Sequence, residues 1–275
     1  MLIRVGILTA PHIEWEQKEH TFVLKDVRIG IGFHWDRKED QEFQGALEIR
    51  NNADGTQTAI NTLDLEDYLC SVISSEMNSN SPMELLKAHA VISRSWALRA
   101  IDKPNHEGFH VCADDHCQRY EGLRRRNERA VQAVKATAGQ VLMYGEEICD
   151  CRYYKCCGGK TEIWSTCWED KDVPYIRSVD CPYCGRASER TLRLVLNDYD
   201  QETKDFHDWQ VSYTAEQLSE IVRTKTGIDF GEITDLVPLK RGVSGRIYEL
   251  QIVGTKRTEV IGKELNIRYS LDRKS

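Results

Sequence analysis

Two stretches of this sequence hold the side chains best suited to chemistry. The first contains Glu76, which stands just before the polar turn 77–80 and between two segments with helical patterns. A carboxyl group at a helix end can face a cleft while the helix holds it, and it can then donate or accept a proton. Judged by the sequence alone, the alternative is a solvated glutamate, since most glutamates are exposed.

The second stretch, residues 106–117, holds three histidines and two cysteines within twelve residues. Thiolate and imidazole are the ligands that zinc prefers in tetrahedral sites. The stretch therefore indicates a zinc site. A Cys112–Cys117 disulfide and free thiols are the alternatives.

Ten cysteines are many for 275 residues, and nine of them lie between residues 112 and 184. Cys181 and Cys184 have the Cys-x-x-Cys spacing of redox proteins, but they follow an irregular segment rather than a strand. A disulfide, or a second metal site formed with Cys156, Cys157 or Cys167, fits this context better. Cys149 and Cys151 lie two apart in a segment that we expect to be a strand, where they would share one face as small buried residues.

The elements that must position these side chains include both strands and helices. Residues 1–64 have strand patterns, including an alternating run over 27–33, and residues 65–138 have three helical patterns. Ser81, Pro82 and Glu84 predict a capping box for the second helix, and Gly139 predicts the end of the third. The remaining expectations are a hairpin around Gly145, a strand at 192–196, a helix at 214–226 and strands at 233–239, 247–253 and 258–261.

This order predicts an α+β fold, with mixed β-strands around a central helical segment and with a substrate groove. We expect a β-rich segment at 1–64, a catalytic core with the His/Cys loop at 65–195, and a β-rich segment at 196–275 that completes the same domain. A net charge of −7 without a basic block argues against nucleic acid as a partner. No apolar run is long enough for a membrane span, and the N-terminus resembles a first strand rather than a signal peptide.

The chain resembles the SpoIID/LytB family of peptidoglycan-cleaving proteins over about residues 60–270. Its motifs occur in the family's order: Ser75-Glu76-Met77, Gln118-Arg119-Tyr120-Glu121-Gly122, Cys157-Gly158-Gly159-Lys160-Thr161 and Ser244-Gly245-Arg246. One position departs from the pattern, because Cys157 replaces the usual serine before the glycine pair. Substrate contacts at this position are then expected to differ.

The resemblance implies a lytic transglycosylase, a glycan lyase in which Glu76 is the only acid/base. Glu76 would protonate the bond between N-acetylmuramic acid and N-acetylglucosamine and then deprotonate the C6 hydroxyl, which closes a 1,6-anhydro ring. This chemistry requires a glutamate whose pKa is raised by partial burial. Hydrolysis by a carboxyl pair, in contrast, needs two carboxyl groups.

By family position, the substrate-binding residues are Tyr120, Lys155, Cys157, Gly158 and Gly159. Some family members hold zinc beside the cleft with one histidine and two cysteines. This resemblance selects His106, Cys112 and Cys117 as ligands, with His110 and His116 as substitutes.

The family also sets expectations for partners and location. The partners are peptidoglycan glycan strands and, in some members, a cell-wall amidase, and the location is the cell envelope. The alternative function is a non-catalytic peptidoglycan-binding protein that enhances an N-acetylmuramoyl-L-alanine amidase.

Overall fold

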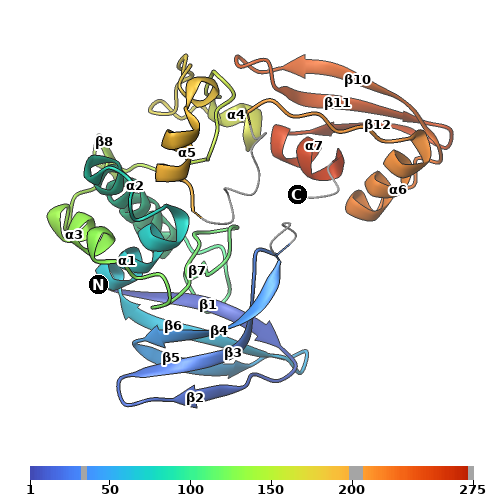
Figure 1. Cartoon of the computed structure of the whole chain (residues 1–275). Helices are drawn as coiled ribbons and strands as arrows, with labels where there is room; N and C mark the ends of the chain where they lie inside the picture. Colours follow the sequence, from blue (N-terminus) through green and yellow to red (C-terminus); the bar gives the residue numbers. More distant parts are fainter. Residues whose placement is uncertain (32–35, 198–206, 272–275) are drawn as a thin grey trace. The chain divides into compact units, whose positions relative to one another are not determined.

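The computed structural model describes residues 1–31, 36–197 and 207–271 (Figure 1). The chain forms two compact units. The first unit consists of residues 1–153 and 188–203, and the second of residues 154–187 and 204–275. Helices and strands occur in both units, so the predicted α+β class is confirmed. The proposed segment boundaries at residues 64/65 and 195/196 stay a prediction.

The first unit is built on two antiparallel-rich sheets with the orders β5-β6-β1-β7 and β2-β3-β4. Ile3 and Val5 on β1 are fully buried, as expected for alternate residues on the inner face of a strand. Strands β1 and β6 pair antiparallel from Leu2↔Asp64 onward, with an irregularity between Gly6 and Leu8. The strand bounds are β1 Leu2–Ala10, β2 Trp15–Gln17, β3 Thr21–Ile29, β4 Arg37–Gln44, β5 Ala46–Asn51, β6 Gln57–Asp64 and β7 Val111–Cys112.

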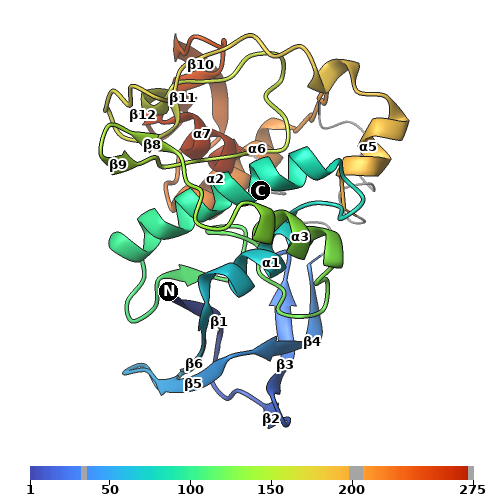
Figure 2. The same cartoon turned by 90° about the vertical axis from the view of Figure 1, so that its left-hand side faces the viewer.

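Three helices pack together in this unit, as Figures 1 and 2 show. They are α1 Leu65–Glu76, α2 Met83–Asp102 and α3 Glu128–Ala136. Asp64 caps α1 by accepting a hydrogen bond from the Glu66 N–H, and α1 ends at Glu76 because Met77 has an extended backbone. Apolar side chains of α1, α2 and α3 share one core with β1, β3 and β4.

The predicted capping box of α2 is wrong. Pro82 is the N-cap and makes no side-chain cap. The Ser81 hydroxyl instead donates to the Leu194 carbonyl, which lies at the end of a separate short helix. Helix α3 ends at Ala136 rather than at Gly139, because the backbone of Thr137 is no longer helical. The turn that follows reaches Gly139, whose φ of 71° is the left-handed conformation that favours glycine there.

Two predicted strands also differ in the first unit. Residues 192–195 belong to a helix, α5 Glu189–Val195, and Leu196 is its C-cap. Ser188 caps the first turn of this helix by accepting from the Thr191 N–H. The hairpin around Gly145 is confirmed but short, with β8 Met143–Tyr144 and β9 Glu147–Ile148, so Cys149 and Cys151 do not lie in a strand. The strand predicted at 27–33 ends at Ile29, and residues 32 and 33 lie outside the described residues.

The second unit contains an antiparallel sheet with the order β10-β11-β12 and helices α6 and α7, which contact it. Its bounds are α4 Trp164–Cys167, η1 Cys184–Arg186, α6 Ala215–Thr226, β10 Ile233–Arg241, β11 Ile247–Gly254, β12 Thr258–Gly262 and α7 Glu264–Leu271. Thr214 and Gln217 form a capping box at the start of α6, as the sequence pattern predicts. Leu250 and Ile252 on β11 face Val222 of α6 and form a separate core.

None of the helices that the structure describes has both the length and the apolar composition needed to cross a membrane.

Candidate functional site

Glu76 is the last residue of α1, and its carboxylate is held by two donors. Its Oε1 atom accepts hydrogen bonds from the Arg119 N–H at 2.9 Å and from the Tyr153 hydroxyl at 3.1 Å. The residue is partly buried. The structure therefore places Glu76 at a helix end, as predicted, and fixes its carboxyl group between two segments that are distant in sequence.

Tyr153 was not predicted as a site residue. Burial, followed by the charge of Glu76, raises the pKa of its hydroxyl well above the usual value, so the hydroxyl stays protonated and can donate. The ring of His89 from α2 meets the Tyr153 ring edge-on, with centroids 4.9 Å apart. Burial lowers the pKa of His89 to about 4, so a neutral imidazole supports the tyrosine at neutral pH.

The His/Cys loop is fixed at the edge of the first sheet. Strand β7 pairs parallel with β1, which places Cys112 opposite Gly6. A Cβ added to Gly6 would lie 2.7 Å from the Phe109 ring, so the ring would have to shift if a larger residue stood there. The same ring stacks on His106 with centroids 4.7 Å apart. The loop thus holds His106 through packing and Cys112 through strand pairing.

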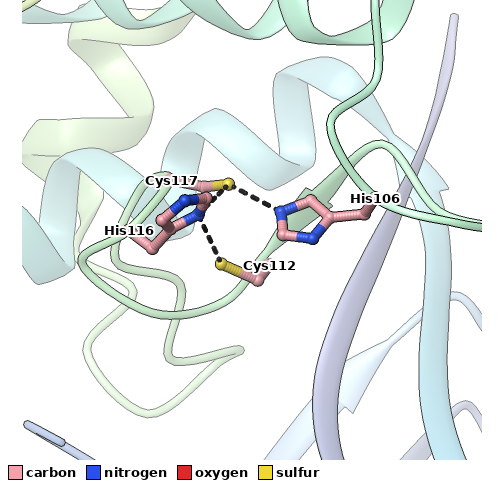
Figure 3. Close-up of side chains that lie close together, drawn as sticks. All are labelled: His106, Cys112, His116 and Cys117. Atoms are coloured by element: carbon pink, nitrogen blue, oxygen red, sulfur yellow. Dashed lines mark hydrogen bonds between the residues drawn. The ribbon is translucent and has the colours of Figure 1, made fainter. Parts of the chain in front are cut away.

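Four side chains of this loop converge, as Figure 3 shows. The Cys117 sulfur lies 3.2 Å from His106 Nε2 and 3.5 Å from His116 Nδ1, and the Cys112 sulfur lies 3.8 Å from the same His116 atom. A hydrogen bond from the Cys117 thiol lowers the pKa of Cys112 to about 5, which favours the thiolate that binds metals. This cluster could hold a metal ion.

The structure brings one further residue to the predicted set. His106, Cys112 and Cys117 come together as predicted, and His116, named as a substitute, joins them. His110 does not, because its Nδ1 atom accepts a hydrogen bond from the Arg4 N–H.

A short segment connects this cluster to Glu76. Only Gln118 separates Cys117 from Arg119, whose N–H binds the Glu76 carboxylate. The Arg119 side chain forms an ion pair with Glu121, and both side chains are almost completely buried. The backbone that donates to Glu76 is therefore fixed on both sides, by the cluster and by the buried ion pair.

Tyr120 lies in the core of the first unit with 2 % of its surface exposed. Its hydroxyl donates to Asn61 at 2.7 Å, and its ring packs against Phe43 and Tyr68. In this structure the phenol is not open to a ligand. The substrate-binding role expected for Tyr120 stays a prediction.

A pocket in the first unit lies beside the same segment. Its polar lining includes Asp114, Asp115 and Arg119, and its apolar lining includes Ile7 and Val27. Desolvation, and then the charges of Glu76 and Asp114, raise the pKa of Asp115 to about 7. A second carboxyl group thus lies near Glu76, which the sequence did not indicate. A glycan-sized groove stays a prediction.

The other predicted substrate residues, Lys155, Cys157, Gly158 and Gly159, belong to the second unit. Both glycines have a positive φ, 64° and 100°, which forms a tight turn that favours glycine. The Arg246 guanidinium donates to the carbonyl oxygens of Cys157 and Lys160 and so fixes this turn. The substrate roles of these four residues stay predictions.

Two family models match separate stretches of the chain. The SpoIID family, described as stage II sporulation protein, matches residues 53–144, and a domain of unknown function, DUF8618, matches residues 162–275. The first match includes Glu76 and all four residues of the His/Cys cluster.

Three curated relatives match part of the chain. An uncharacterized protein of Brachyspira hyodysenteriae is 34% identical over 167 residues, which cover 60% of this chain and 45% of that protein. Stage II sporulation protein D of Bacillus subtilis is 25% identical over 145 residues, and that of Bacillus amyloliquefaciens is 24% identical over 144 residues. Each of these two matches covers 46% of this chain and 40% of the relative.

The chain thus spans less than half the length of the curated relatives it matches. The family that the motifs predicted matches residues 53–144, whereas the motifs predict a resemblance over about residues 60–270. The motifs at 157–161 and 244–246 lie outside this match, and the second of them falls within the DUF8618 match. The chain carries a domain of the SpoIID family over residues 53–144, and this domain contains both Glu76 and the His/Cys cluster.

Proposed function

We propose that the protein is a peptidoglycan lytic transglycosylase in which Glu76 is the acid/base. The observation that carries this proposal is the position of Glu76 within the SpoIID domain, at a helix end and held by two donors on one carboxylate oxygen. A positioned carboxyl group is the main requirement of this chemistry.

In the proposed reaction, Glu76 gives its proton to the glycosidic oxygen between N-acetylmuramic acid and N-acetylglucosamine. The glycosidic bond breaks and leaves Glu76 as a carboxylate. This carboxylate takes the proton of the C6 hydroxyl of N-acetylmuramic acid, while the C6 oxygen bonds to the anomeric carbon of the same sugar. The proton returns to Glu76, and the product carries a 1,6-anhydro end. The Arg119 N–H and the Tyr153 hydroxyl orient the carboxyl group throughout.

We further propose that the His/Cys cluster binds zinc as a structural ion. A tetrahedral zinc with Zn–S of about 2.3 Å and Zn–N of about 2.0 Å separates its sulfur and nitrogen ligands by roughly 3.5 Å. Three of the sulfur–nitrogen distances within the cluster, 3.2, 3.5 and 3.8 Å, lie around this value. Two cysteines and two histidines complete a structural site and leave no position for substrate. The ion would hold residues 112–117 and, through them, the Arg119 N–H.

The second candidate is a non-catalytic peptidoglycan-binding protein that enhances an N-acetylmuramoyl-L-alanine amidase. Such a protein needs a surface for its partner but no positioned acid. The two donors on Glu76 favour the enzyme.

The test is digestion of purified, peptide-stripped glycan followed by mass analysis of the ends. We expect 1,6-anhydro ends from the wild type and none from Glu76→Gln, because an amide neither donates nor accepts the required proton. The glutamine carbonyl still accepts from Arg119 and Tyr153, so folding and glycan binding are expected to persist. Glu84→Gln is the matched control, since the Glu84 side chain is 82% exposed in α2.

Each other result has a defined meaning. Unchanged product from Glu76→Gln excludes Glu76 as the acid/base. No product from the wild type, together with faster cleavage by an added amidase, supports the enhancer. Reducing ends that disappear in both Glu76→Gln and Asp115→Asn indicate hydrolysis by a carboxyl pair instead.

A further inference from the structure

Three cysteines meet in the second unit, away from the cluster described above. Cys157 comes from the glycine turn, and Cys181 and Cys184 come from the Cys-x-x-Cys motif. Their three sulfur atoms all lie within 4.8 Å of one another. Cys157 is buried, and the other two are partly buried. Nothing in the proposed reaction uses this group.

The sulfur spacing indicates a shared metal ion rather than a disulfide. The Cys157 and Cys184 sulfur atoms are 3.7 Å apart, whereas a disulfide bond is about 2.05 Å long. Two thiolates on one tetrahedral zinc, each with a Zn–S bond of about 2.3 Å, lie about 3.8 Å apart. The observed distance therefore matches the edge of a zinc tetrahedron.

The backbone around the three sulfur atoms is built as a fixed frame. The segments on either side run next to each other, with hydrogen bonds from the Cys181 N–H to the Gly159 carbonyl at 2.8 Å and from the Thr161 N–H to the Val179 carbonyl at 3.0 Å. Arg246, from the turn between β10 and β11, donates to the carbonyl oxygens of Cys157 and Lys160. Two distant segments of the second unit thus hold the cysteine positions.

His207 lies beside this group and is the candidate fourth ligand, although its nitrogen atoms are not within 4.8 Å of all three sulfur atoms in this structure. A Cβ placed on Gly185 would lie 2.6 Å from His207 Nε2, so this nitrogen is directed at the backbone next to Cys184. Its other nitrogen, Nδ1, lies 2.7 Å from the Asp208 carboxylate. A carboxylate that accepts from Nδ1–H leaves the Nε2 lone pair available, which is the usual arrangement of metal-binding histidines.

The two remaining cysteines of the region differ from these three. The Cys156 sulfur accepts a hydrogen bond from the Gly158 N–H of its own turn. Cys167, on α4, does not belong to the metal-binding group found among the described residues.

We propose that Cys157, Cys181, Cys184 and His207 bind a second, structural zinc ion, which ties the glycine turn to the Cys-x-x-Cys motif. Soft thiolates with one imidazole are a typical structural zinc set.

The test measures metal content in the full chain purified under reducing conditions. We expect about two zinc ions per chain in the wild type, one at each cluster, and about one in Cys181→Ser and in Cys184→Ser. Cys167→Ser is the matched control and should keep both ions. His207→Ala should weaken zinc retention during dialysis against a chelator, whereas Cys156→Ser should not.

A second measurement keeps the test independent of folding in the variants. Chelator-treated wild type, and a Cys112→Ser variant that lacks the first cluster, are titrated with Co²⁺. In both proteins we expect an intense thiolate-to-cobalt charge-transfer band, together with the strong visible d–d bands that are typical of tetrahedral Co²⁺. No such absorption in the Cys112→Ser variant would overturn the second site. A mass 2 Da lower, with the loss of two free thiols, would show a disulfide instead, and this result too would overturn it. Loss of zinc from Cys156→Ser but not from His207→Ala would show that Cys156, and not His207, is the fourth ligand.

Discussion

At the scale of single residues, the candidate site depends on the donors that orient the Glu76 carboxylate. Glu76 Oε1 receives the Arg119 N–H and the Tyr153 hydroxyl. The first donor belongs to the backbone, and only a proline at position 119 would remove it, at the cost of distorting the segment. Tyr153 is therefore the residue through which the orientation of Glu76 can be tested.

Tyr153→Phe should reduce anhydro-product formation without loss of glycan binding. A hydrogen bond to a charged group contributes about 1.5 to 3 kcal/mol, which corresponds to a fall in rate of about ten-fold or more. Turnover and KM on stripped glycan measure the effect, and we expect kcat to fall while KM stays nearly constant. Tyr154→Phe, at a neighbouring tyrosine that is 58% exposed, should have no effect. Equal rates for both variants would remove Tyr153 from the site.

His89 should make the stability of the protein depend on pH. Its pKa is about 4 because burial disfavours the charged form, whereas an unfolded histidine has a pKa of about 6.5. As the pH falls from 6.5 to 4, only the unfolded state binds the proton, so stability decreases over this window by up to about 3 kcal/mol and then levels off. Urea unfolding at a series of pH values measures this contribution.

The matched variants separate His89 from other titrating groups. His89→Gln should flatten the pH dependence between 6.5 and 4, whatever its stability at neutral pH. His20→Gln should retain it, because that side chain is 85% exposed. A curve for His89→Gln that is parallel to the wild type would contradict the expected role of His89.

At the scale of elements, Arg94 of α2 holds the three helices together. It is only 1% exposed, and it forms a two-bond ion pair with Glu66 of α1 at 2.8 and 2.7 Å. It also donates to the carbonyl oxygens of Val134, in α3, and Gln140. Because α1 ends at Glu76, this network fixes the helix that carries the proposed acid.

Glu66→Gln should destabilise the first unit by about 2 to 3 kcal/mol. Removing one partner of a buried ion pair costs about 3 to 5 kcal/mol, and the partial exposure of Glu66 reduces this value. Urea unfolding is the measurement. Arg99→Met, which removes a pair with the 79% exposed Glu147, should cost less than about 1 kcal/mol. Similar losses for the two variants would show that the Arg94 network has no special role.

The loop with the first cluster is the second element on which the site depends. Cys112→Ser should release zinc, lower stability, and increase amide hydrogen exchange over residues 106–121, since metal binding is coupled to folding. Activity should also fall, because the Arg119 N–H that orients the Glu76 carboxylate would be displaced. Cys167→Ser provides the control, and unchanged exchange in Cys112→Ser would exclude a structural role for the ion.

At the scale of the whole molecule, the described residues form two cores with different family matches. The first core belongs to the unit that contains the SpoIID match, and the second lies within the DUF8618 match. Each core combines a sheet with helices. Among the described residues, the first unit contains the His/Cys cluster and the second contains the group of three cysteines. The chain thus has two structural units, each with a hydrophobic core and a proposed metal site.

The sequence by itself determined the features that depend on local order. Helical periodicity located α1 and α6, the turn at 77–80 located Glu76 at a helix end, and the motifs identified the SpoIID domain. The cysteine and histidine spacing located the first cluster. These features follow from neighbouring residues, whose periodicity and capping are visible in the chain.

Only the tertiary structure decided which distant groups meet. Tyr153 reaches Glu76 across 77 positions, and Arg246 fixes the Cys157 turn across 89. Of the two substitute histidines, His116 joins the cluster and His110 does not, because His110 accepts from the β1 backbone. The helix found at 189–195 is tied to the start of α2 by the Ser81 hydroxyl, which donates to the Leu194 carbonyl across 113 positions. Such choices depend on packing and on the satisfaction of buried hydrogen bonds, which no local pattern specifies.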